Sequence, residues 1–269
     1  MVAPFGILVT VLTAEGSTPR EAGATLEVTE AGQRGTIGGG RLEFDAIDLA
    51  RHMLKSGAVR ETRSIALGPR IGQCCGGRVE LLFERVTEAL AERKARDAEA
   101  ARAAQASVYL FGAGHTGSAL AAALAPLPLQ TTLIDSRAHA LAAVPETIRT
   151  IAAAMPESLV AAAPPGSAFV VMTHDHALDF LIAAAALERR DAAYVGMIGS
   201  ATKRARFGSY LGELGRKADL ARLTLPLGGS ALRDKRPAVI AALTAAELCT
   251  CLLSYHQKTL PVRLADAPL

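Results

Sequence analysis

The chain has 269 residues, of which 50% are hydrophobic and only 4% aromatic, so it is long enough for one large or two ordinary domains with an aliphatic core. The formal net charge is +3, and the interleaving of basic and acidic residues argues against a dedicated nucleic-acid surface. No run approaches about 18 consecutive apolar residues without proline, glycine or charge, and the N-terminus lacks a signal pattern; the sequence therefore predicts a cytoplasmic protein without a membrane segment.

The first 86 residues combine predicted strands with one helix. A β-branched run at 7–13 predicts a strand that ends at the turn sequence Gly-Ser-Thr-Pro-Arg, and alternation over 25–28 predicts a second strand. Three glycines at 38–40 precede a helical pattern that ends near residue 57. These glycines form either a tight packed turn or an anion cradle at the helix N-terminus. Glu43 and Asp45 are interpreted as partners of the helix dipole rather than catalytic acids.

A cysteine loop at residues 67–77 follows, between two further predicted strands. Cys74 and Cys75 lie between glycine pairs, which predicts a tight, exposed loop. Arg70 and Arg78 favour the thiolate form, which a sulfur ligand or nucleophile needs. The alternative is that the two cysteines are small apolar side chains on a glycine-rich turn.

The four cysteines form two close pairs, Cys74-Cys75 and Cys249-x-Cys251. This pattern is not a disulfide framework, which indicates reduced thiols. A zinc site would need both pairs to converge, and neither pair has the usual ligand spacing.

The composition changes after residue 86. Residues 87–105 are mostly Ala, Glu, Arg and Lys, which predicts an exposed helix between a domain at 1–86 and a second domain at 106–269. The second domain opens with an apolar strand at 107–111, the sequence Gly-Ala-Gly-His-Thr-Gly and an alanine-rich helix. Strand, GxGxxG and helix are the arrangement of a dinucleotide-binding turn, and an acid at the end of the next strand is expected to bind ribose. The residues expected to contact a nucleotide or cofactor here are Gly112, Gly114, His115, Gly117 and Asp135.

Two more strands, at 168–173 and 193–198, run into polar residues. Because the carboxyl ends of parallel strands share one rim, His174, Asp175 and Ser200 are expected beside the glycine turn. The Thr-His-Asp-His sequence is interpreted as rim contacts to a ligand, as a locally satisfied turn, or as a metal site for which no third ligand of suitable spacing is evident. The predicted fold is α/β: an N-terminal mixed α+β domain with a Cys-Cys loop, then a Rossmann-like parallel-sheet domain.

With these motifs in place, the chain resembles the XdhC/CoxI family. The matching segments occur in the family's order and cover almost the whole chain; the Gln-Cys-Cys-Gly-Gly loop is far more diagnostic than the nucleotide turn. The matching segments are 16–20, 37–40 with Glu43, 67–69, 73–77, 111–115, 173–176 with Asp179, 194–200 and 237–241.

The resemblance implies an accessory factor for xanthine dehydrogenase rather than a turnover catalyst. Such factors bind the molybdenum cofactor (molybdopterin), protect it while a cysteine desulfurase supports its sulfuration, and insert it into the molybdenum-binding subunit of the apoenzyme. It further implies that Gln73, Cys74 and Cys75 help to hold the cofactor, with possible contacts from the thiols to molybdenum or sulfur. The glycine turn is expected to take the pterin phosphate, and alanine-rich helix faces are compatible with a homodimer.

Two other functions stay open at this point. An NAD(P)-dependent oxidoreductase would use the glycine turn and Asp135, with His174 or His115 as acid or base. A dithiol redox protein would use Cys74 and Cys75, but adjacent cysteines close a strained ring on oxidation, which disfavours it.

Overall fold

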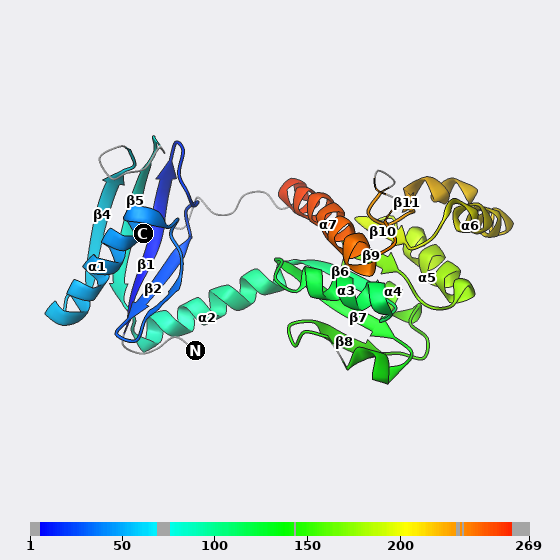
Figure 1. Ribbon diagram of the computed structural model, residues 1–269, viewed down its shortest axis with the longest axis horizontal. Coiled ribbons are helices and arrows are strands. Elements are labelled where there is room, and N and C mark those ends of the chain that lie inside the picture. The colour runs from blue at the N-terminus through cyan, green and yellow to red at the C-terminus, as the bar shows by residue number, and fades with distance from the viewer. Residues whose placement is uncertain (1–5, 69–75, 143, 230–231, 233, 260–269) are drawn as a thin grey trace. The chain divides into compact units, whose positions relative to one another are not determined.

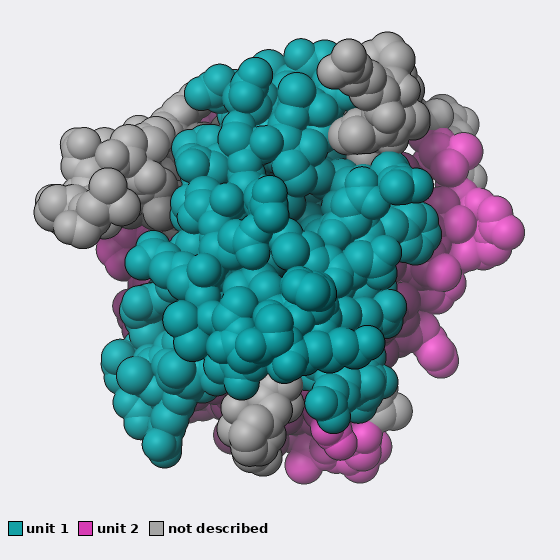
Figure 2. Space-filling model, turned by 90° about the vertical axis from the view of Figure 1, so that its left-hand side faces the viewer, with its two compact units in different colours: residues 1–100 teal, residues 101–269 magenta. Residues whose placement is uncertain are grey.

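The computed structural model describes residues 6–68, 76–142, 144–229, 232 and 234–259 (Figure 1). The chain divides into two compact units, Met1–Ala100 and Ala101–Leu269, which Figure 2 colours separately. The division falls inside helix α2 (Glu88–Ala103), whose only buried side chain is Leu90. The other residues of α2 are exposed or partly exposed.

Unit 1 is built on a five-stranded antiparallel sheet with the order β3-β2-β1-β5-β4. One helix, α1, packs on one face of this sheet (Figure 1). The antiparallel sheet and its helix confirm the expected α+β architecture. The elements are β1 (Gly6–Glu15), β2 (Thr25–Thr29), β3 (Gln33–Gly35), α1 (Gly40–Ser56), β4 (Arg60–Ala66) and β5 (Arg78–Arg85).

The core of unit 1 follows from the spacing of apolar residues on α1. Side chains three or four positions apart lie on one face of a helix, and this face packs on alternating residues of β1, β2 and β5. The helix ends at Gly57, whose φ of 81° is left-handed and whose N–H donates to the Met53 carbonyl. The buried α1 residues are Leu42, Ala46, Ile47, Ala50 and Met53.

Unit 2 contains a six-stranded sheet in which all neighbouring strands are parallel. The order β8-β7-β6-β9-β10-β11 starts at β6 in the middle, runs outward to β8, and restarts at β9 beside β6. This is the order of a Rossmann fold, with its topological switch point between β6 and β9. The strands are β6 (Ala106–Phe111), β7 (Leu129–Asp135), β8 (Arg149–Ala152), β9 (Ala168–Val171), β10 (Tyr194–Met197) and β11 (Leu223–Thr224).

Helices cover both faces of this sheet (Figure 1). Helices α3 and α7 share one core cluster with inward side chains of β6 and β9, and helices α4, α5 and α6 share the other. Strands buried on both faces explain the continuous apolar runs that the sequence shows at β9 and β10. The helical elements are α3 (His115–Leu124), η2 (Ala138–Leu141), α4 (Ser158–Ala161), α5 (His176–Glu188), α6 (Ala201–Glu213), η3 (Lys217–Arg222) and α7 (Pro237–Thr259).

Helix α7 is also long and apolar enough, by length and composition alone, to cross a bilayer over Pro237–Tyr255, where its mean hydropathy is 1.7. No other helix in the described part of the chain meets that test. Its inner face, with Ala241, Ala245, Leu248 and Leu252, belongs to the core that α3 shares. Of its apolar window, 28% is buried inside the structure.

Candidate functional site

Three sequence motifs of unit 1 meet at one end of its sheet. A Cβ on Gly77 would lie 2.4 Å from the Glu15 carbonyl oxygen and 2.6 Å from that of Ser17. A Cβ on Gly38, whose φ is 128°, would lie 2.4 Å from Cγ of Pro19. The backbone thus requires glycine at both positions, because the Gly-Ser-Thr-Pro-Arg loop packs against both other glycine loops.

The cysteine loop belongs to this end of unit 1 through its described flanks. The Leu67 N–H donates to the Gly77 carbonyl at 2.8 Å, which closes the β4–β5 connection. A Cβ on Gly68 or Gly76 would meet no atom of the described residues within 4 Å. Gln73, Cys74 and Cys75 themselves lie outside the described residues, in the stretch 69–75.

The triple-glycine turn already holds an anion from its own chain. One carboxylate oxygen of Glu43 accepts hydrogen bonds from Thr36 Oγ1 at 2.5 Å, Ile37 N at 3.0 Å and Gly39 N at 3.1 Å. Burial alone would raise the pKa of Glu43, but these donors outweigh it and lower the pKa below its ordinary value. Of the two interpretations of the glycines, the packed turn describes the structure, with Glu43 in the place of an external anion.

This arrangement predicts that Glu43 stabilises unit 1. We expect Glu43→Ala to lower its free energy of unfolding by about 1–3 kcal/mol, because two backbone donors lose their acceptor. The matched control is Asp45→Ala, which removes only an exposed i,i+4 ion pair with Arg41 and should stay within about 0.5 kcal/mol. Urea denaturation followed by circular dichroism measures both, and equal effects would contradict this role of Glu43.

In unit 2, the predicted glycine turn connects β6 to α3 at the carboxyl edge of the sheet. Gly112 has a φ of 112°, and a Cβ there would lie 2.3 Å from the Met172 carbonyl oxygen at the end of β9. A Cβ on Gly117 would lie 1.8 Å from the Gly112 carbonyl oxygen. These two glycines are therefore required for the turn and for close packing of helix on strand.

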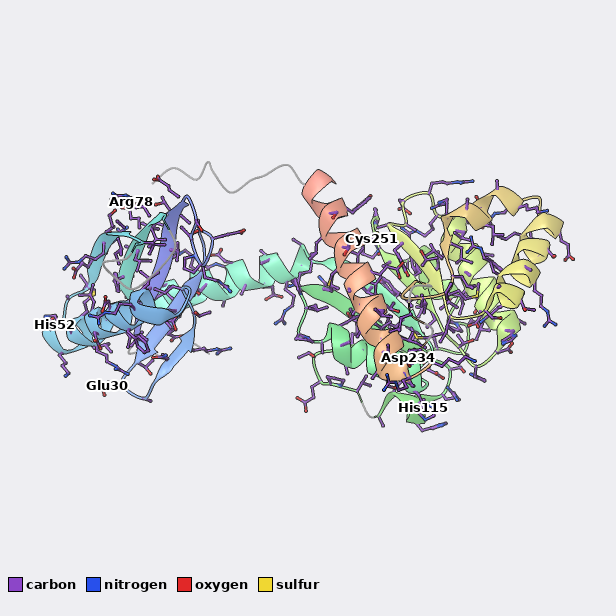
Figure 3. The ribbon with its side chains drawn as sticks, turned by 45° about the horizontal axis from the view of Figure 1, so that its top comes forward. Glu30, His52, Arg78, His115, Asp234 and Cys251 are labelled. Carbon is purple, nitrogen blue, oxygen red and sulfur yellow. The ribbon has the colours of Figure 1, made fainter. Side chains whose placement is uncertain are left out.

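Gly114 differs from both of its neighbours in the motif. Its φ of −75° is open to any residue, and an added Cβ would meet no atom of the described chain within 4 Å. It is the N-cap of α3, and no side chain caps that helix. The free backbone N–H groups of the first turn, with His115 exposed beside them (Figure 3), thus border open space where an anion is favoured.

Asp135 lies at the end of β7, where the sequence predicts it. Its Oδ2 accepts hydrogen bonds from Ala113 N at 2.8 Å and Arg137 Nη2 at 2.9 Å, and its Oδ1 accepts from Arg137 N and Nε, both at 2.9 Å. Burial opposes ionisation, but the hydrogen bonds from Arg137 and Ala113 outweigh it and hold the pKa of Asp135 well below its ordinary value. The ionised carboxylate therefore ties the glycine turn to the end of β7.

The residues after β9 divide between the rim and the helix that follows. His174 is exposed, whereas the Asp175 carboxylate caps α5, accepting from Ala177 N at 2.8 Å and Leu178 N at 3.4 Å. Ser200 is the N-cap residue of α6. Within the described residues, no group of three His, Cys, Asp or Glu side chains is placed to hold a metal ion.

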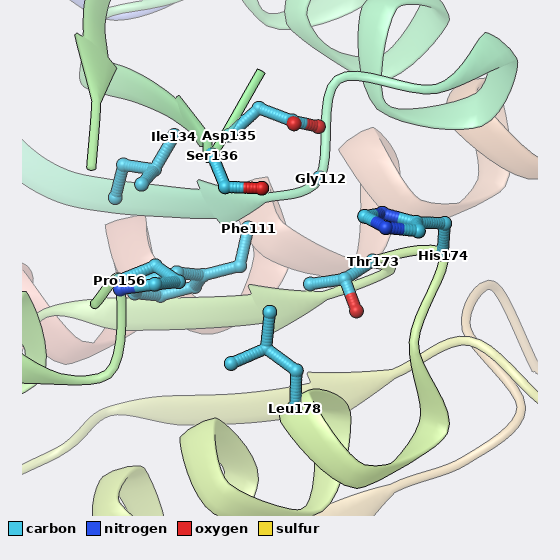
Figure 4. A pocket seen from close by; sticks show the side chains of 9 residues that line it. All are labelled: Phe111, Gly112, Ile134, Asp135, Ser136, Pro156, Thr173, His174 and Leu178. Carbon is cyan, nitrogen blue, oxygen red and sulfur yellow. The ribbon is translucent and has the colours of Figure 1, made fainter. Parts of the chain in front are cut away.

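A small hollow lies at the switch point, with about 220 Å³ of empty space that includes space open to solvent. Figure 4 shows its lining from the ends of β6, β7 and β9 and from α5. Its enclosed part measures only about 10 Å³, roughly the room of one water molecule, so the hollow is a shallow depression rather than a formed ligand pocket. The lining residues are Phe111, Gly112, Ile134, Asp135, Ser136, Pro156, Thr173, His174 and Leu178.

Comparison with known proteins agrees with both units. Residues 6–65 match the model of the XdhC and CoxI family, and residues 108–248 match that of the XdhC Rossmann domain. The chain belongs to the XdhC and CoxI family. Its fold is similar to a crystal structure described as a xanthine dehydrogenase from Bacillus halodurans, with a TM-score of 0.78 and 19% identity, covering 95% of this chain and 94% of that one. No curated protein matches the sequence.

A buried ion pair, which the sequence motifs of this XdhC/CoxI chain did not indicate, lies beneath the rim. Lys203 of α6 contacts Asp179 of α5, and their side chains are 9% and 0% exposed. Lys203 also donates to the Ile198 carbonyl at 2.8 Å, while Asp179 accepts from Thr173 N at 2.9 Å. The pair therefore joins the loops that follow β9 and β10.

The two cysteines that the structure describes both lie in α7, far along the sequence from the glycine turn at 112–117. Cys249 and Cys251 are free and partly buried, and burial raises the pKa of both thiols. The Cys251 thiol donates to the Ala193 carbonyl at 3.3 Å. Protonated, partly buried thiols of this kind pack as small apolar groups.

Proposed function

We propose that the chain is an accessory factor that binds the molybdenum cofactor and delivers it to xanthine dehydrogenase or a related molybdenum hydroxylase. Membership of the XdhC and CoxI family supports this role. The observation that carries cofactor binding is Gly114, where an uncapped helix N-terminus borders open space at the switch point of a Rossmann fold.

The residues of unit 2 fit the phosphate of molybdopterin. A phosphate is stabilised by the free N–H groups and the positive end of a helix. Gly114 leaves room for it, because a Cβ there would fill space that no atom of the described residues occupies.

The proposal keeps Gln73, Cys74 and Cys75 as contacts to the cofactor's molybdenum or sulfur, as the family resemblance implies. Soft thiolates suit that chemistry, which the bound cofactor would supply. The proposed partners are the molybdenum-binding subunit of apo xanthine dehydrogenase, a cysteine desulfurase that supports sulfuration, and a second copy of the chain. Such a factor acts in the cytoplasm and does not turn over a substrate.

The test is the pterin content of the full-length chain, expressed in a host that makes the cofactor and measured as fluorescence of the oxidised pterin. We expect a stoichiometric signal that Cys74→Ala with Cys75→Ala largely removes. The matched control, Cys249→Ala with Cys251→Ala, removes two cysteines from α7 and should retain the signal. An unchanged signal in the first variant would take Cys74 and Cys75 out of the mechanism.

Gly114→Ala tests the turn separately. The new methyl group should exclude the phosphate and lower pterin content at least about tenfold, because charge-assisted hydrogen bonds contribute about 1.5–3 kcal/mol. The melting temperature should not fall, since alanine fits the φ of −75° and restricts the unfolded chain. Full pterin content in this variant would show that the phosphate binds elsewhere.

A second candidate, an NAD(P)-dependent oxidoreductase, is favoured by the Rossmann strand order and its switch point. Micromolar binding of a nicotinamide dinucleotide by a well-folded protein that carries no pterin would establish it in place of the first.

A further inference from the structure

The carboxylate of Asp135 has no acceptor position left for a ligand. A carboxylate accepts about four hydrogen bonds, and Asp135 accepts four from Ala113 and Arg137, at 2.8–2.9 Å. In dinucleotide-binding domains, the acid at this position instead accepts from the hydroxyls of a ribose. The chain's own donors occupy that place here, so a ribose diol would have to displace Arg137.

Arg137 is held in a fixed orientation by the same contacts. Its guanidinium has five N–H donors, and two of them form the fork to Asp135. The other three have no acceptor in the part of the chain that the structure describes, and the side chain is 38% exposed. Because a fork pre-organises a guanidinium, these donors are presented at the carboxyl edge of the sheet at little entropic cost.

The pair also changes the charge of the edge. An unpaired carboxylate beside the glycine turn would repel a phosphate, whereas Asp135 is neutralised by Arg137. Among the nine residues that line the hollow, Asp135 is the only acid. Asp175, in the segment that follows β9, accepts hydrogen bonds from the first turn of α5 and caps that helix.

We infer that Arg137 binds a second anionic group of the ligand, in the place where a dinucleotide-binding domain would bind an unphosphorylated ribose. The inference rests on the proposed phosphate position at Gly114. It makes the ligand class a phosphorylated molecule with a further anion, and it disfavours a nucleotide recognised through a free 2′,3′-diol.

The test compares 2′,5′-ADP with 5′-AMP, which differ in one phosphate on the ribose, by calorimetric titration of the full-length chain. We expect 2′,5′-ADP to bind at least about tenfold more tightly, as a charge-assisted fork of hydrogen bonds would give. Arg137→Gln should reduce this ratio to about one by weakening 2′,5′-ADP alone. Arg137→Lys keeps the charge without the fork and should keep part of the preference.

The matched control is Arg149→Gln, which removes the same charge from the exposed first residue of β8 and should leave the ratio unchanged. Equal affinities, a preference for 5′-AMP, or an unchanged ratio in Arg137→Gln would each overturn the inference. Binding of neither nucleotide would overturn it together with the phosphate position at Gly114. A wild-type chain that prefers 2′,5′-ADP but carries no pterin would support Arg137 while overturning the proposed function.

Discussion

Lys203→Met is expected to lower the free energy of unfolding of unit 2 by about 3–5 kcal/mol, because it leaves the Asp179 carboxylate as an unpaired charge in the interior. Asp179 is 0% exposed, and its second oxygen already accepts from Thr173. The Ile198 carbonyl also loses a donor. Chemical denaturation followed by circular dichroism measures the loss.

Two further variants separate charge from packing. Asp179→Asn combined with Lys203→Met removes both charges and keeps an acceptor for Thr173, so it should recover most of the lost stability. Arg96→Met, which removes one partner of an exposed pair with Glu92, should stay within about 0.5 kcal/mol. A double variant as unstable as Lys203→Met would show that the pair acts through shape rather than charge.

Gly117→Ala is expected to destabilise unit 2 by more than about 4 kcal/mol, the range that marks a disrupted core. The new Cβ would lie 1.8 Å from the Gly112 carbonyl oxygen, and this oxygen is backbone, which cannot move aside as a side-chain end can. Thermal unfolding and the yield of soluble protein measure the effect. Gly114→Ala, in the same motif, is the natural comparison.

The difference in stability between Gly114→Ala and Gly117→Ala tests the turn more directly than either variant alone. Gly114→Ala should retain or slightly raise stability, by up to about 1 kcal/mol, while Gly117→Ala should not yield a folded unit. If both variants unfolded at the same temperature, the turn would not have the packing described for it.

The Rossmann unit could be predicted from sequence because its signals are local. An apolar strand, the glycine turn and an alanine-rich helix are contiguous, and Asp135 follows at the end of the next strand. Strands β8 and β11 lack such signals. The first has four residues with little burial and the second has only two, so their positions are set by pairing with β7 and β10.

The roles of the site residues were less accessible, because they depend on contacts made only in the folded chain. The sequence places Asp135 correctly, but its engagement depends on Arg137, two residues later, and on the backbone of Ala113. Asp179 and Lys203 are 24 positions apart and meet only because α5 and α6 pack side by side. One acid in the first turn of a mostly apolar helix was the signal that the sequence offered.

For the cysteine loop, the sequence is more informative than the structure. Its chemistry is conspicuous in the sequence, but the structure describes only its flanks, Gly68 and Gly76. The contacts of Cys74 and Cys75 stay a prediction that the pterin measurement tests.

The three glycines of the turn also carry different information about ancestry. Gly112 and Gly117 are constrained by the backbone around them, so any descendant that keeps the fold must keep them. Gly114 has no such steric constraint within the described chain, and under the proposed function the bound phosphate selects for it. In a duplicated copy released from cofactor handling, position 114 should therefore be the first of the three to drift. A relative that carries a side chain at this position would therefore have kept the fold and lost cofactor binding.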